Sequence, residues 1–208
     1  MPANAVLAVS GPSGVGKSTI SGVLSCCLEA QGWTIRLVHQ DSHFLGPKPT
    51  SYWTQENKDH PGAVDMAAFR GAVAAARGAY ATQTLVIIEG FLLLQDEPLM
   101  ALVDAVLFLR CDPSACLVRR QGRSERTAHE REGLTHYYEQ YVWPSFLQHT
   151  VPALERLRTQ SSRQVALAEV DGSATIEVVA ENAAAALPSL LPALADAAAA
   201  AAAADAPS

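Results

Sequence analysis

The sequence predicts an α/β protein in which a five-stranded parallel β-sheet is covered by helices on both faces, giving three layers. Three observations lead to this fold class. Short runs rich in leucine and β-branched residues alternate with longer helical stretches, which is the pattern of parallel strands joined by helical crossovers. The short runs are almost continuously apolar, as expected for strands that are covered on both faces. A glycine-rich turn follows the first run and opens the first helix.

Length and composition describe one domain. The chain has 208 residues, of which 49% are hydrophobic and 17% charged, and a chain of this size buries a substantial core without disulfides or metals. Its 15 basic and 21 acidic residues give a net charge of −6, which argues against an extended nucleic-acid partner because that partner needs a basic surface. The sequence has no apolar run of about 18 residues and no export signal. We therefore expect a cytoplasmic protein without a membrane partner.

Five apolar runs are the strand candidates. Each is short and is bounded by polar or turn-forming residues, as buried strands usually are. They cover residues 5–10, 34–39, 84–88, 105–109 and 165–170.

Helix candidates lie between these runs. The first begins at Lys17, directly after the glycine-rich turn, and another begins at Pro113, where Asp112 is placed to cap it. Proline cannot continue the hydrogen-bond pattern inside a helix, so Pro144 and Pro152 should interrupt the longest segment. The expected helices cover residues 17–31, 64–77, 113–121, a broken pair over 135–158, and 174–186.

Two segments fall outside this alternation. Residues 40–62 form a long connection rich in proline, glycine, histidine and aromatic residues, a composition that favours a functional loop. The alanine-rich end of the chain offers no sided apolar face that would hold a helix against the core. We therefore expect a domain over residues 1–187 and a frayed or disordered tail over residues 188–208.

Residues 11–18, GPSGVGKS, match the phosphate-binding pattern G-x-x-x-x-G-K-[ST] without a mismatch. The motif follows an apolar strand and opens a helix, which is the context it requires. Backbone N–H groups and the helix N-terminus attract a polyanion, Lys17 reaches the β and γ phosphates, and Ser18 offers a hydroxyl to Mg²⁺. The predicted fold is therefore that of a P-loop NTPase using ATP and Mg²⁺, with Lys17 catalytic. The residues expected to hold the nucleotide here are Gly11, Ser13, Gly14, Val15, Gly16, Lys17, Ser18 and Thr19.

The same motif occurs in GTPases, in motor or transporter ATPases and in small-molecule kinases. A GTPase requires an N-K-x-D motif late in the chain, whereas Asn57-Lys58-Asp59 lacks the spacer and occurs early. A motor or transporter ATPase carries a second nucleotide motif ending in aspartate and further segments, for which 208 residues leave little room. A small-molecule kinase is the best match.

Two carboxylates follow predicted strands. Glu89 comes directly after the run at 84–88, at the sheet edge where open α/β folds bind ligands, and is placed either to organise Mg²⁺ through water or to contact the acceptor. Asp41 follows the run at 34–39, which we expect to lie beside the strand that leads into the P-loop. There Asp41 is placed to accept a proton from an attacking hydroxyl, as a sugar-hydroxyl kinase requires. The alternative for Asp41 is a loop-capping role.

One stretch of this acidic chain is strongly basic. It contains Arg119, Arg120 and Arg123, followed by Arg126 and Arg131. A run of charges is often only a solvated helix face. In a P-loop kinase, arginines after the fourth strand instead form a lid that closes over the triphosphate and neutralises charge that develops during transfer. We expect Arg119, Arg120 and Arg123 to bind the nucleotide in this way.

Several segments, taken in order along the chain, form a recognisable pattern. They are residues 11–18, Gln40-Asp41, Asp59-His60-Pro61, IIEGFLLL at 87–94, the lid arginines and Val142-Trp143-Pro144. Together they resemble the nicotinamide riboside kinases, close relatives of uridine kinases, and the similarity covers roughly residues 5–181. The resemblance implies transfer of the ATP γ-phosphoryl group to the ribose 5′-hydroxyl of nicotinamide riboside, giving nicotinamide mononucleotide for NAD synthesis.

The resemblance also implies roles for individual residues. Asp41 would be the catalytic base, Ser18 and Glu89 would serve Mg²⁺, and Asp59 would hold the ribose hydroxyls. A carboxylate accepts two hydroxyl hydrogen bonds at once, which suits Asp59 to this role. The alternative for Asp59 is a turn aspartate before His60-Pro61.

The chain departs from this family at the positions that bind the base. The family commonly has a tyrosine before the ribose-binding aspartate, where this chain has Lys58, and a lysine is repelled by a cationic ring. Tyr52 and Trp53 lie a few residues earlier and offer an aromatic face instead, since a cation–π contact with a desolvated ring is worth about 2 kcal/mol. Tyr137 and Tyr138 are the candidates for a second stacking residue, with core packing expected for at least one of them.

The expected substrate site therefore consists of Asp41, Tyr52, Trp53, Asp59, Glu89 and Tyr137. Two alternatives remain open: a kinase for uridine, cytidine or another nucleoside, and a degenerate nucleotide-binding regulator. The regulator would have lost Asp41 or the lid, and this chain keeps both. We expect a small-molecule nucleoside as the partner and a monomeric or homodimeric protein.

Overall fold

The computed structural model describes residues 4–46, 52–53, 56–78, 83–124, 126–159 and 165–192. Five strands form one sheet in the order β2-β3-β1-β4-β5, and all neighbouring pairs are parallel. The strands are β1 Ala5–Ser10, β2 Thr34–His39, β3 Thr84–Gly90, β4 Ala105–Arg110 and β5 Ala166–Asp171. The predicted five-stranded parallel sheet is confirmed.

The apolar runs locate all five strands, but three strands end later than predicted. β1 and β2 have the predicted bounds, whereas β3, β4 and β5 run on through polar residues. In β3, Glu89 still pairs with Val9 on one side and with His39 on the other. Backbone hydrogen bonds do not depend on side-chain polarity, so a ladder can extend beyond the apolar run that predicts it.

Strand β2 lies at the edge of the sheet, with β3 between it and β1. The expectation that the strand before Asp41 lies directly beside the P-loop strand is therefore wrong. The physical reason is visible in the composition of β2, because Arg36 is exposed and Ile35 is the strand's one buried residue. A strand flanked on both sides would be apolar almost throughout, as β3 is.

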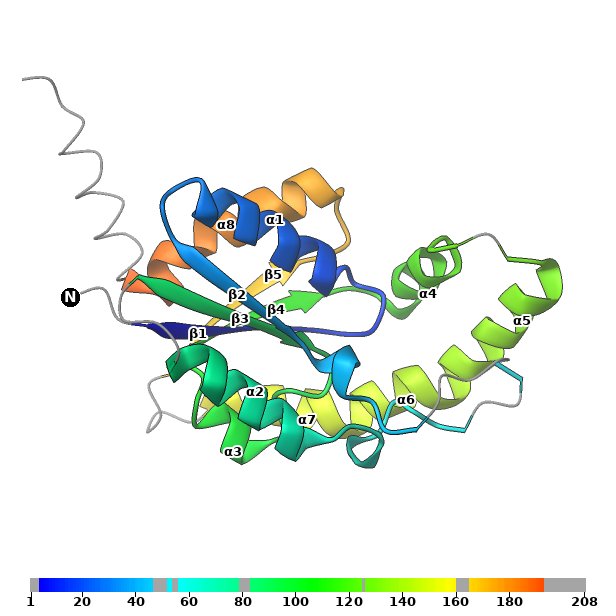
Figure 1. Ribbon diagram of the computed structural model, residues 1–208. Coiled ribbons are helices and arrows are strands. Elements are labelled where there is room, and N and C mark those ends of the chain that lie inside the picture. The colour runs from blue at the N-terminus through cyan, green and yellow to red at the C-terminus, as the bar shows by residue number, and fades with distance from the viewer. Residues whose placement is uncertain are drawn as a thin grey trace, which may run out of the picture.

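Helices cover both faces of the sheet (Figure 1). α1 Lys17–Glu29 and α8 Ile176–Leu190 lie on one face, while α2 Met66–Gly78, α3 Glu97–Met100 and α7 Val151–Thr159 lie on the other. Side chains alternate between the faces along β1, so that Leu7 and Val9 join one apolar core whereas Val6 and Ala8 join the other. The three-layer arrangement of a P-loop NTPase is confirmed.

Two further helices, α4 Pro113–Gln121 and α5 Ala128–Tyr137, extend beyond the carboxyl ends of the strands. Asp112 occupies the N-cap of α4 as predicted, although its side chain makes no capping hydrogen bond. Thr127 caps α5 in a reciprocal pair of bonds with Glu130, which explains why α5 begins earlier than expected. Figure 1 shows α5, α6 and α7 as one curved helical arm that runs from this end to beneath the sheet.

The predicted interruption takes the form of changes in helix type rather than breaks in the helix. The chain stays helical through α5, a π-helical segment Tyr138–Val142, α6 Trp143–Ser145, a second π-helical segment Phe146–Thr150 and α7. Pro144 directly follows the start of α6, and Pro152 the start of α7. A π-helical turn is wider than an α-helical one, so the proline rings are accommodated where an α-helix would meet a clash. Such insertions bend a helix rather than end it.

Helix α8 is longer than the sequence predicts. It continues past Ala186 through Pro188 to Leu190, and Leu187, Leu190 and Leu191 are buried in the core beside α1 and β5. The prediction therefore ends the helix and begins the tail at residue 188 too early. It overlooked these leucines, which form an apolar face that packs against the core. Residues 193–208 lie outside the described residues. Neither α8 nor another helix of the described ranges is long and apolar enough to cross a membrane.

Candidate functional site

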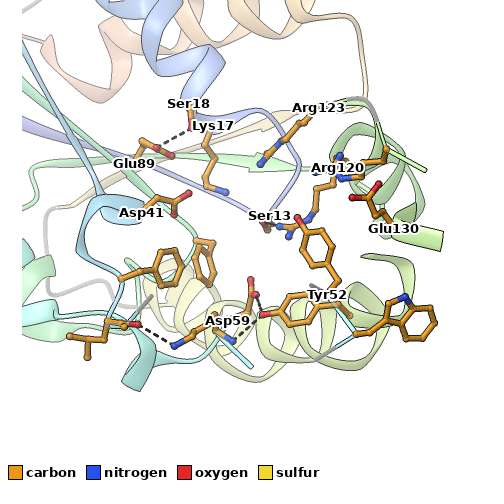
Figure 2. A pocket seen from close by; sticks show the side chains of 18 of the residues that line it. Ser13, Lys17, Ser18, Asp41, Tyr52, Asp59, Glu89, Arg120, Arg123 and Glu130 are labelled. Carbon is orange, nitrogen blue, oxygen red and sulfur yellow. Dashed lines mark hydrogen bonds between the residues drawn. The ribbon is translucent and has the colours of Figure 1, made fainter. Parts of the chain in front are cut away.

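A cavity of about 520 Å³ opens at the carboxyl edge of the sheet, between the P-loop, the connection after β2 and the α4–α5 region. Figure 2 shows Lys17 and Asp41 pointing into the same space, with Arg120 and Arg123 entering from the opposite side. The cavity collects most of the predicted site residues. Its lining comprises Ser13, Lys17, Ser18, Asp41, Phe44, Leu45, Gly46, Tyr52, Trp53, Lys58, Asp59, Glu89, Phe91, Arg120, Arg123, Arg126, His129, Glu130 and Tyr137.

The P-loop has the backbone of a phosphate cradle. Gly11, Gly14 and Gly16 have φ angles of 146°, 102° and 106°, which side-chain-bearing residues rarely adopt. A Cβ atom on Gly11 would lie 2.4 Å from the Leu109 carbonyl oxygen, and one on Gly14 would lie 2.4 Å from that of Cys116. The loop therefore needs glycine both for its turn and for its close approach to β4 and α4.

Not every predicted loop residue offers a side chain to the cavity. Val15 is buried in the core, and Thr19 is exposed on α1 without lining the cavity. In a cradle of this type the backbone N–H groups hold the phosphates, so Val15 and the glycines contribute through the main chain. Ser13, Lys17 and Ser18 are the loop residues that line the cavity.

Lys17 is buried, and its ammonium group donates to the carbonyl oxygens of Gly11 and Pro12, each at 3.1 Å. Burial lowers the pKa of Lys17, while the negative charges of Glu89 and Asp41 oppose that change. A buried cation with only carbonyl partners attracts an anionic group strongly. The position therefore suits contact with the outer phosphates of a bound triphosphate.

Ser18, Glu89 and His39 meet at one carboxylate oxygen. Ser18 Oγ donates to Glu89 Oε1 at 3.0 Å, and His39 Nδ1 lies 2.8 Å from the same atom. Glu89 is buried, at 4% exposure. A hydroxyl and a carboxylate are oxygen donors, and Mg²⁺ is commonly held by one or two such protein groups together with phosphate oxygens and water. These residues fit Mg²⁺, and the predicted pair for the metal is brought together.

Asp41 lies on the short helical turn Gln40–His43 that follows β2. The buried Gln40 side chain fixes this turn, because its amide donates to the Leu92 carbonyl and accepts from the Leu92 N–H, both at 3.0 Å. Burial raises the pKa of Asp41, and the positive charge of Lys17 opposes that rise. Asp41 thus faces the space in front of Lys17, although its strand is not the neighbour of β1.

Asp59 forms part of the opposite wall. It is 7% exposed, and its Oδ2 accepts a 2.9 Å hydrogen bond from the Tyr137 hydroxyl. Ser145 donates to the Asp59 carbonyl oxygen, and Asn57 accepts from its N–H at 2.9 Å. Burial raises the pKa of Asp59, with the charge of Arg120 opposing the rise. A carboxylate held this firmly inside a cavity is placed to accept hydrogen bonds from a polyol.

The three predicted lid arginines separate into two groups. Arg120 and Arg123 line the cavity, and Arg120 donates to the Ser13 hydroxyl. Arg119 is absent from the lining; its guanidinium donates to the carbonyl oxygens of Val15 at 3.2 Å and of Ala174 at 3.0 Å. It also donates to the carbonyls of Gly172 and Ser173. The structure therefore does not bring Arg119 to the cavity, because backbone acceptors of the P-loop and the β5–α8 turn engage it.

The predicted aromatic residues differ in their surroundings. Tyr52 lines the cavity beside Tyr137, with ring centroids 5.8 Å apart, and the Arg126 guanidinium lies 5.9 Å from the Tyr52 centroid. Tyr138 is buried against Trp143 and does not line the cavity. Tyr137 is therefore the tyrosine of this pair that faces the site. Burial raises the pKa of Tyr137, so its hydroxyl stays a hydrogen-bond donor.

Eight cavity residues were not predicted as site residues, among them Phe44, Phe91 and Arg126. The rings of Phe44 and Phe91 stack at 6.1 Å. Arg126 donates to the Arg120 and Gln121 carbonyl oxygens at 2.9 and 3.1 Å and so caps the end of α4. The position of Phe91 directly after Glu89-Gly90 is a signal that could have identified it, since it follows a strand that ends at the site.

The arrangement can perform phosphoryl transfer. One side of the cavity presents backbone N–H groups and cationic side chains, which hold and neutralise phosphate oxygens. The other side presents two carboxylates: Asp41, which faces the lysine, and the buried Asp59, which lies in the far wall. A P-loop with an acidic residue aimed at the transferred group, arginines above it and a polar acceptor pocket defines a P-loop phosphotransferase.

Comparison with known proteins agrees with this class. A family model described as AAA domain matches residues 7–137, and the chain belongs to this family. A uridine kinase of Haemophilus influenzae (strain PittEE) is 26% identical over 178 residues, which cover 73% of this chain and 84% of the relative. The family match and this relative both agree with a P-loop phosphotransferase.

Two solved kinases share the fold. A putative fructose transport system kinase from Silicibacter sp. TM1040 has a TM-score of 0.53 at 20% identity, covering 71% of this chain and 84% of that chain. A gluconokinase from Sinorhizobium meliloti 1021 has a TM-score of 0.52 at 17% identity, covering 93% of this chain and 97% of that chain. These similarities support the P-loop kinase fold and do not bear on the acceptor.

Proposed function

We propose that this protein transfers the γ-phosphoryl group of ATP to the 5′-hydroxyl of a ribonucleoside, and that the nucleoside is nicotinamide riboside. The observation that carries the proposal is the meeting of Lys17, Asp41 and Asp59 in one cavity. Lys17 belongs to a phosphate cradle, Asp41 faces it, and Asp59 is a buried carboxylate suited to a ribose diol. A sugar hydroxyl is a poor nucleophile until its proton is accepted, and this cavity supplies a carboxylate for that purpose.

In the proposed reaction Asp41 accepts the proton of the 5′-hydroxyl as the oxygen bonds to the γ-phosphorus. The bond between that phosphorus and the β–γ bridging oxygen breaks, and ADP leaves. Lys17, Arg120 and Arg123 stabilise the negative charge on the transferred group and the leaving group. Ser18 and Glu89 would hold Mg²⁺, which supplies further charge neutralisation at the phosphates.

The choice of nicotinamide riboside rests on the motif resemblance, above all on IIEGFLL and Val142-Trp143-Pro144. The Lys58 ammonium donates to the Leu45 carbonyl oxygen at 3.1 Å, so a backbone acceptor engages the charge that stands where the family has tyrosine. Tyr52 and Tyr137 supply aromatic surface in the cavity wall.

A specific observation favours a second candidate, uridine or cytidine. Arg126 lies 5.9 Å from the Tyr52 centroid, so a cationic ring stacked on Tyr52 would meet a like charge. A neutral pyrimidine with carbonyl oxygens would instead accept hydrogen bonds from a guanidinium. The similarity to a uridine kinase of Haemophilus influenzae agrees with this candidate.

One panel separates the candidates. ADP release is measured with ATP and Mg²⁺ in the presence of nicotinamide riboside, uridine, cytidine or pantothenate, and the phosphorylated product is identified by mass. We expect the highest kcat/KM with nicotinamide riboside, and Lys17→Ala should abolish transfer to every acceptor. A preference for uridine or cytidine would establish the second candidate. ATP consumption with none of the four would contradict the proposed nucleoside kinase, and an inactive protein that still binds ATP would identify a nucleotide-binding regulator.

Two further properties are proposed from the sequence alone: a cytoplasmic location, and a monomeric or homodimeric state. Light scattering after size-exclusion chromatography measures the second directly, and a mass above that of two chains would contradict it. The location is tested by fractionating cells that express the protein.

A further inference from the structure

Trp53 occupies a slot on the surface of α5. Its indole stacks with the imidazole of His129 at 5.3 Å and 23°, and with that of His136 at 5.5 Å and 22°. Its Nε1 donates to the His129 carbonyl oxygen at 3.3 Å. Seven residues of α-helix rise about 10.5 Å, which is the space that an indole needs between two rings at these separations. The indole therefore lies between the two imidazoles, with its N–H edge toward the helix.

The floor of this slot is Gly133. Positions 129, 133 and 136 are four and three residues apart, so they share one face of α5. A Cβ atom on Gly133 would lie 2.6 Å from Trp53 Nε1 and 2.8 Å from Cδ1. Glycine inside a helix costs about 1 kcal/mol relative to alanine. The space that glycine leaves is filled by the indole, which gives a physical reason for this residue in the middle of α5.

The same helix also holds the chain on the far side of Trp53. The Tyr137 hydroxyl at the end of α5 accepts from the Lys58 N–H at 3.0 Å and donates to the Asp59 carboxylate at 2.9 Å. Tyr52 packs against Tyr137 as well. We call residues 52–53 and 56–60 the acceptor segment. Figure 1 shows this cyan part of the chain running beside α5, so both ends of the segment are attached to one helix.

These contacts give Trp53 a role other than the one expected from the sequence. Its ring stacks with two imidazoles and its N–H bonds to the helix backbone, so the contacts that the structure shows for it are with α5. We infer that Trp53 is a positioning residue: by docking in the slot formed by His129, Gly133 and His136, it fixes the acceptor segment on α5 and thereby sets the affinity for the nucleoside. The inference rests on the proposed function, because Asp59 is the group that docking would hold in place.

The test uses Gly133→Ala, which blocks the slot while removing no polar group and favouring the α5 helix. The matched control is Gly71→Ala in α2, where an added Cβ meets no atom within 4 Å. Trp53→Ala removes the docked ring, and Trp53→Phe keeps a ring that can stack between the imidazoles. KM and kcat are measured for the nucleoside that wild type prefers in the panel and, separately, for ATP.

We expect Gly133→Ala and Trp53→Ala each to raise the nucleoside KM about tenfold, the effect of losing roughly 1.4 kcal/mol of positioning. The ATP KM and kcat should change less than about threefold, which corresponds to less than half of the free energy of a tenfold change. Trp53→Phe should recover most of the nucleoside affinity, and Gly71→Ala should match wild type. A nucleoside KM that is unchanged in Gly133→Ala, or an ATP KM that rises in parallel, would overturn the inference.

A spectroscopic measurement tests docking without activity. The chain has three tryptophans, so the difference between wild-type and Trp53→Phe emission isolates Trp53. This component should shift to longer wavelength in Gly133→Ala, because the displaced indole becomes more exposed to water, and should be unchanged in Gly71→Ala. An unshifted component in Gly133→Ala would overturn the docking itself. Failure of the proposed function is distinguishable, since wild type would then phosphorylate no nucleoside of the panel before any variant is compared.

Discussion

The hydroxyl of Ser18 donates a 3.0 Å hydrogen bond to Oε1 of Glu89, although the two residues are 71 positions apart. The bond joins the start of α1, which follows β1, to the end of the neighbouring strand β3. It also aims two oxygen ligands at one point beside the phosphate cradle. The position of His39 on the same carboxylate oxygen limits the freedom of Glu89 further. Several expectations for variants and conditions depend on this geometry and on the groups around it.

The first prediction concerns Asp41 as the base. Asp41→Asn keeps the size of the side chain and removes its ability to accept a proton. We expect kcat to fall about 10²- to 10⁴-fold, the range for a positioned general base, while ATP affinity changes little. Steady-state kinetics and ATP titration measure the two effects. Turnover within a few-fold of wild type in this variant would remove Asp41 from the mechanism.

The second prediction concerns pH. Burial raises the pKa of Asp41 above its ordinary value of 3.8, and Asp41 must be ionised to act as a base. kcat/KM for the nucleoside should therefore fall on acidification at a higher pH than it would for an aspartate with the ordinary pKa. The same carboxyl binds its proton more readily in the folded chain than in the unfolded one, so its contribution to stability is present at low pH and is lost as pH rises through the folded-state pKa. A kcat/KM that stays level down to pH values near 4, with the fold intact, would contradict the assignment.

The third prediction concerns the metal. Glu89→Gln keeps the hydrogen-bonding shape but removes the negative charge that attracts a cation. We expect the Mg²⁺ concentration for half-maximal activity to rise about 10- to 100-fold, as for other losses around a metal. Mn²⁺ binding in the presence of ATP, followed by electron paramagnetic resonance, measures the same loss without turnover. Equal Mn²⁺ affinity in variant and wild type would show that Glu89 serves the acceptor instead.

The fourth prediction concerns the packing that holds Asp41. A Cβ atom on Gly90 would lie 2.5 Å from Gln40 Oε1 and 2.7 Å from Gln40 Cβ. Gly90→Ala should therefore displace Gln40 from Leu92 and lower the free energy of unfolding by about 1–3 kcal/mol. Urea denaturation measures this loss. The control is Gly22→Ala in α1, where no atom lies within 4 Å of the added carbon. An equal change in the free energy of unfolding of both variants would show that the contact with Gln40 does not cause the loss.

The fifth prediction separates the arginines. Arg119→Met leaves four backbone carbonyls of the P-loop and the β5–α8 turn without their donor. We expect a loss of about 1–3 kcal/mol in the free energy of unfolding, because partly buried acceptors lose their hydrogen bonds. Arg123→Met should leave stability nearly unchanged and lower kcat about 100-fold, as loss of a charge-stabilising donor does. If Arg119→Met instead lowered kcat and Arg123→Met lowered the free energy of unfolding, Arg119 would be the residue that binds the nucleotide and Arg123 the structural one.

The strands and the phosphate cradle were predictable because their signals are local. An apolar run such as β3 is visible in the sequence, and the P-loop glycines supply the positive φ angles that the turn itself requires. The edge position of β2 was missed although Arg36 offered a signal. Both faces of a central strand are covered, so a charged residue in the run favours the sheet edge.

Other features depend on partners that are distant in sequence. Arg119 and Arg120 are adjacent, yet one reaches the turn after β5 and the other the cavity. Their separation depends on where α4 packs, which no pattern within the helix specifies. The docking of Trp53 on α5 joins residues 76 positions apart. The sequence placed Trp53 in a connection with the composition of a functional loop. It could not predict the contacts of Trp53 with α5, because these depend on how the two distant segments fold together.

The edge position of β2 bears on how enzymes of this architecture change substrates. The chain segments carrying Asp41, Trp53 and Asp59 all leave from this outer strand, whereas the P-loop leaves from the centre of the sheet. Lengthening, shortening or exchanging the outer connection breaks no hydrogen bond between β1, β3, β4 and β5. Changes in the connection after β2 can therefore alter which acceptor binds, while the P-loop and the strands around it stay the same.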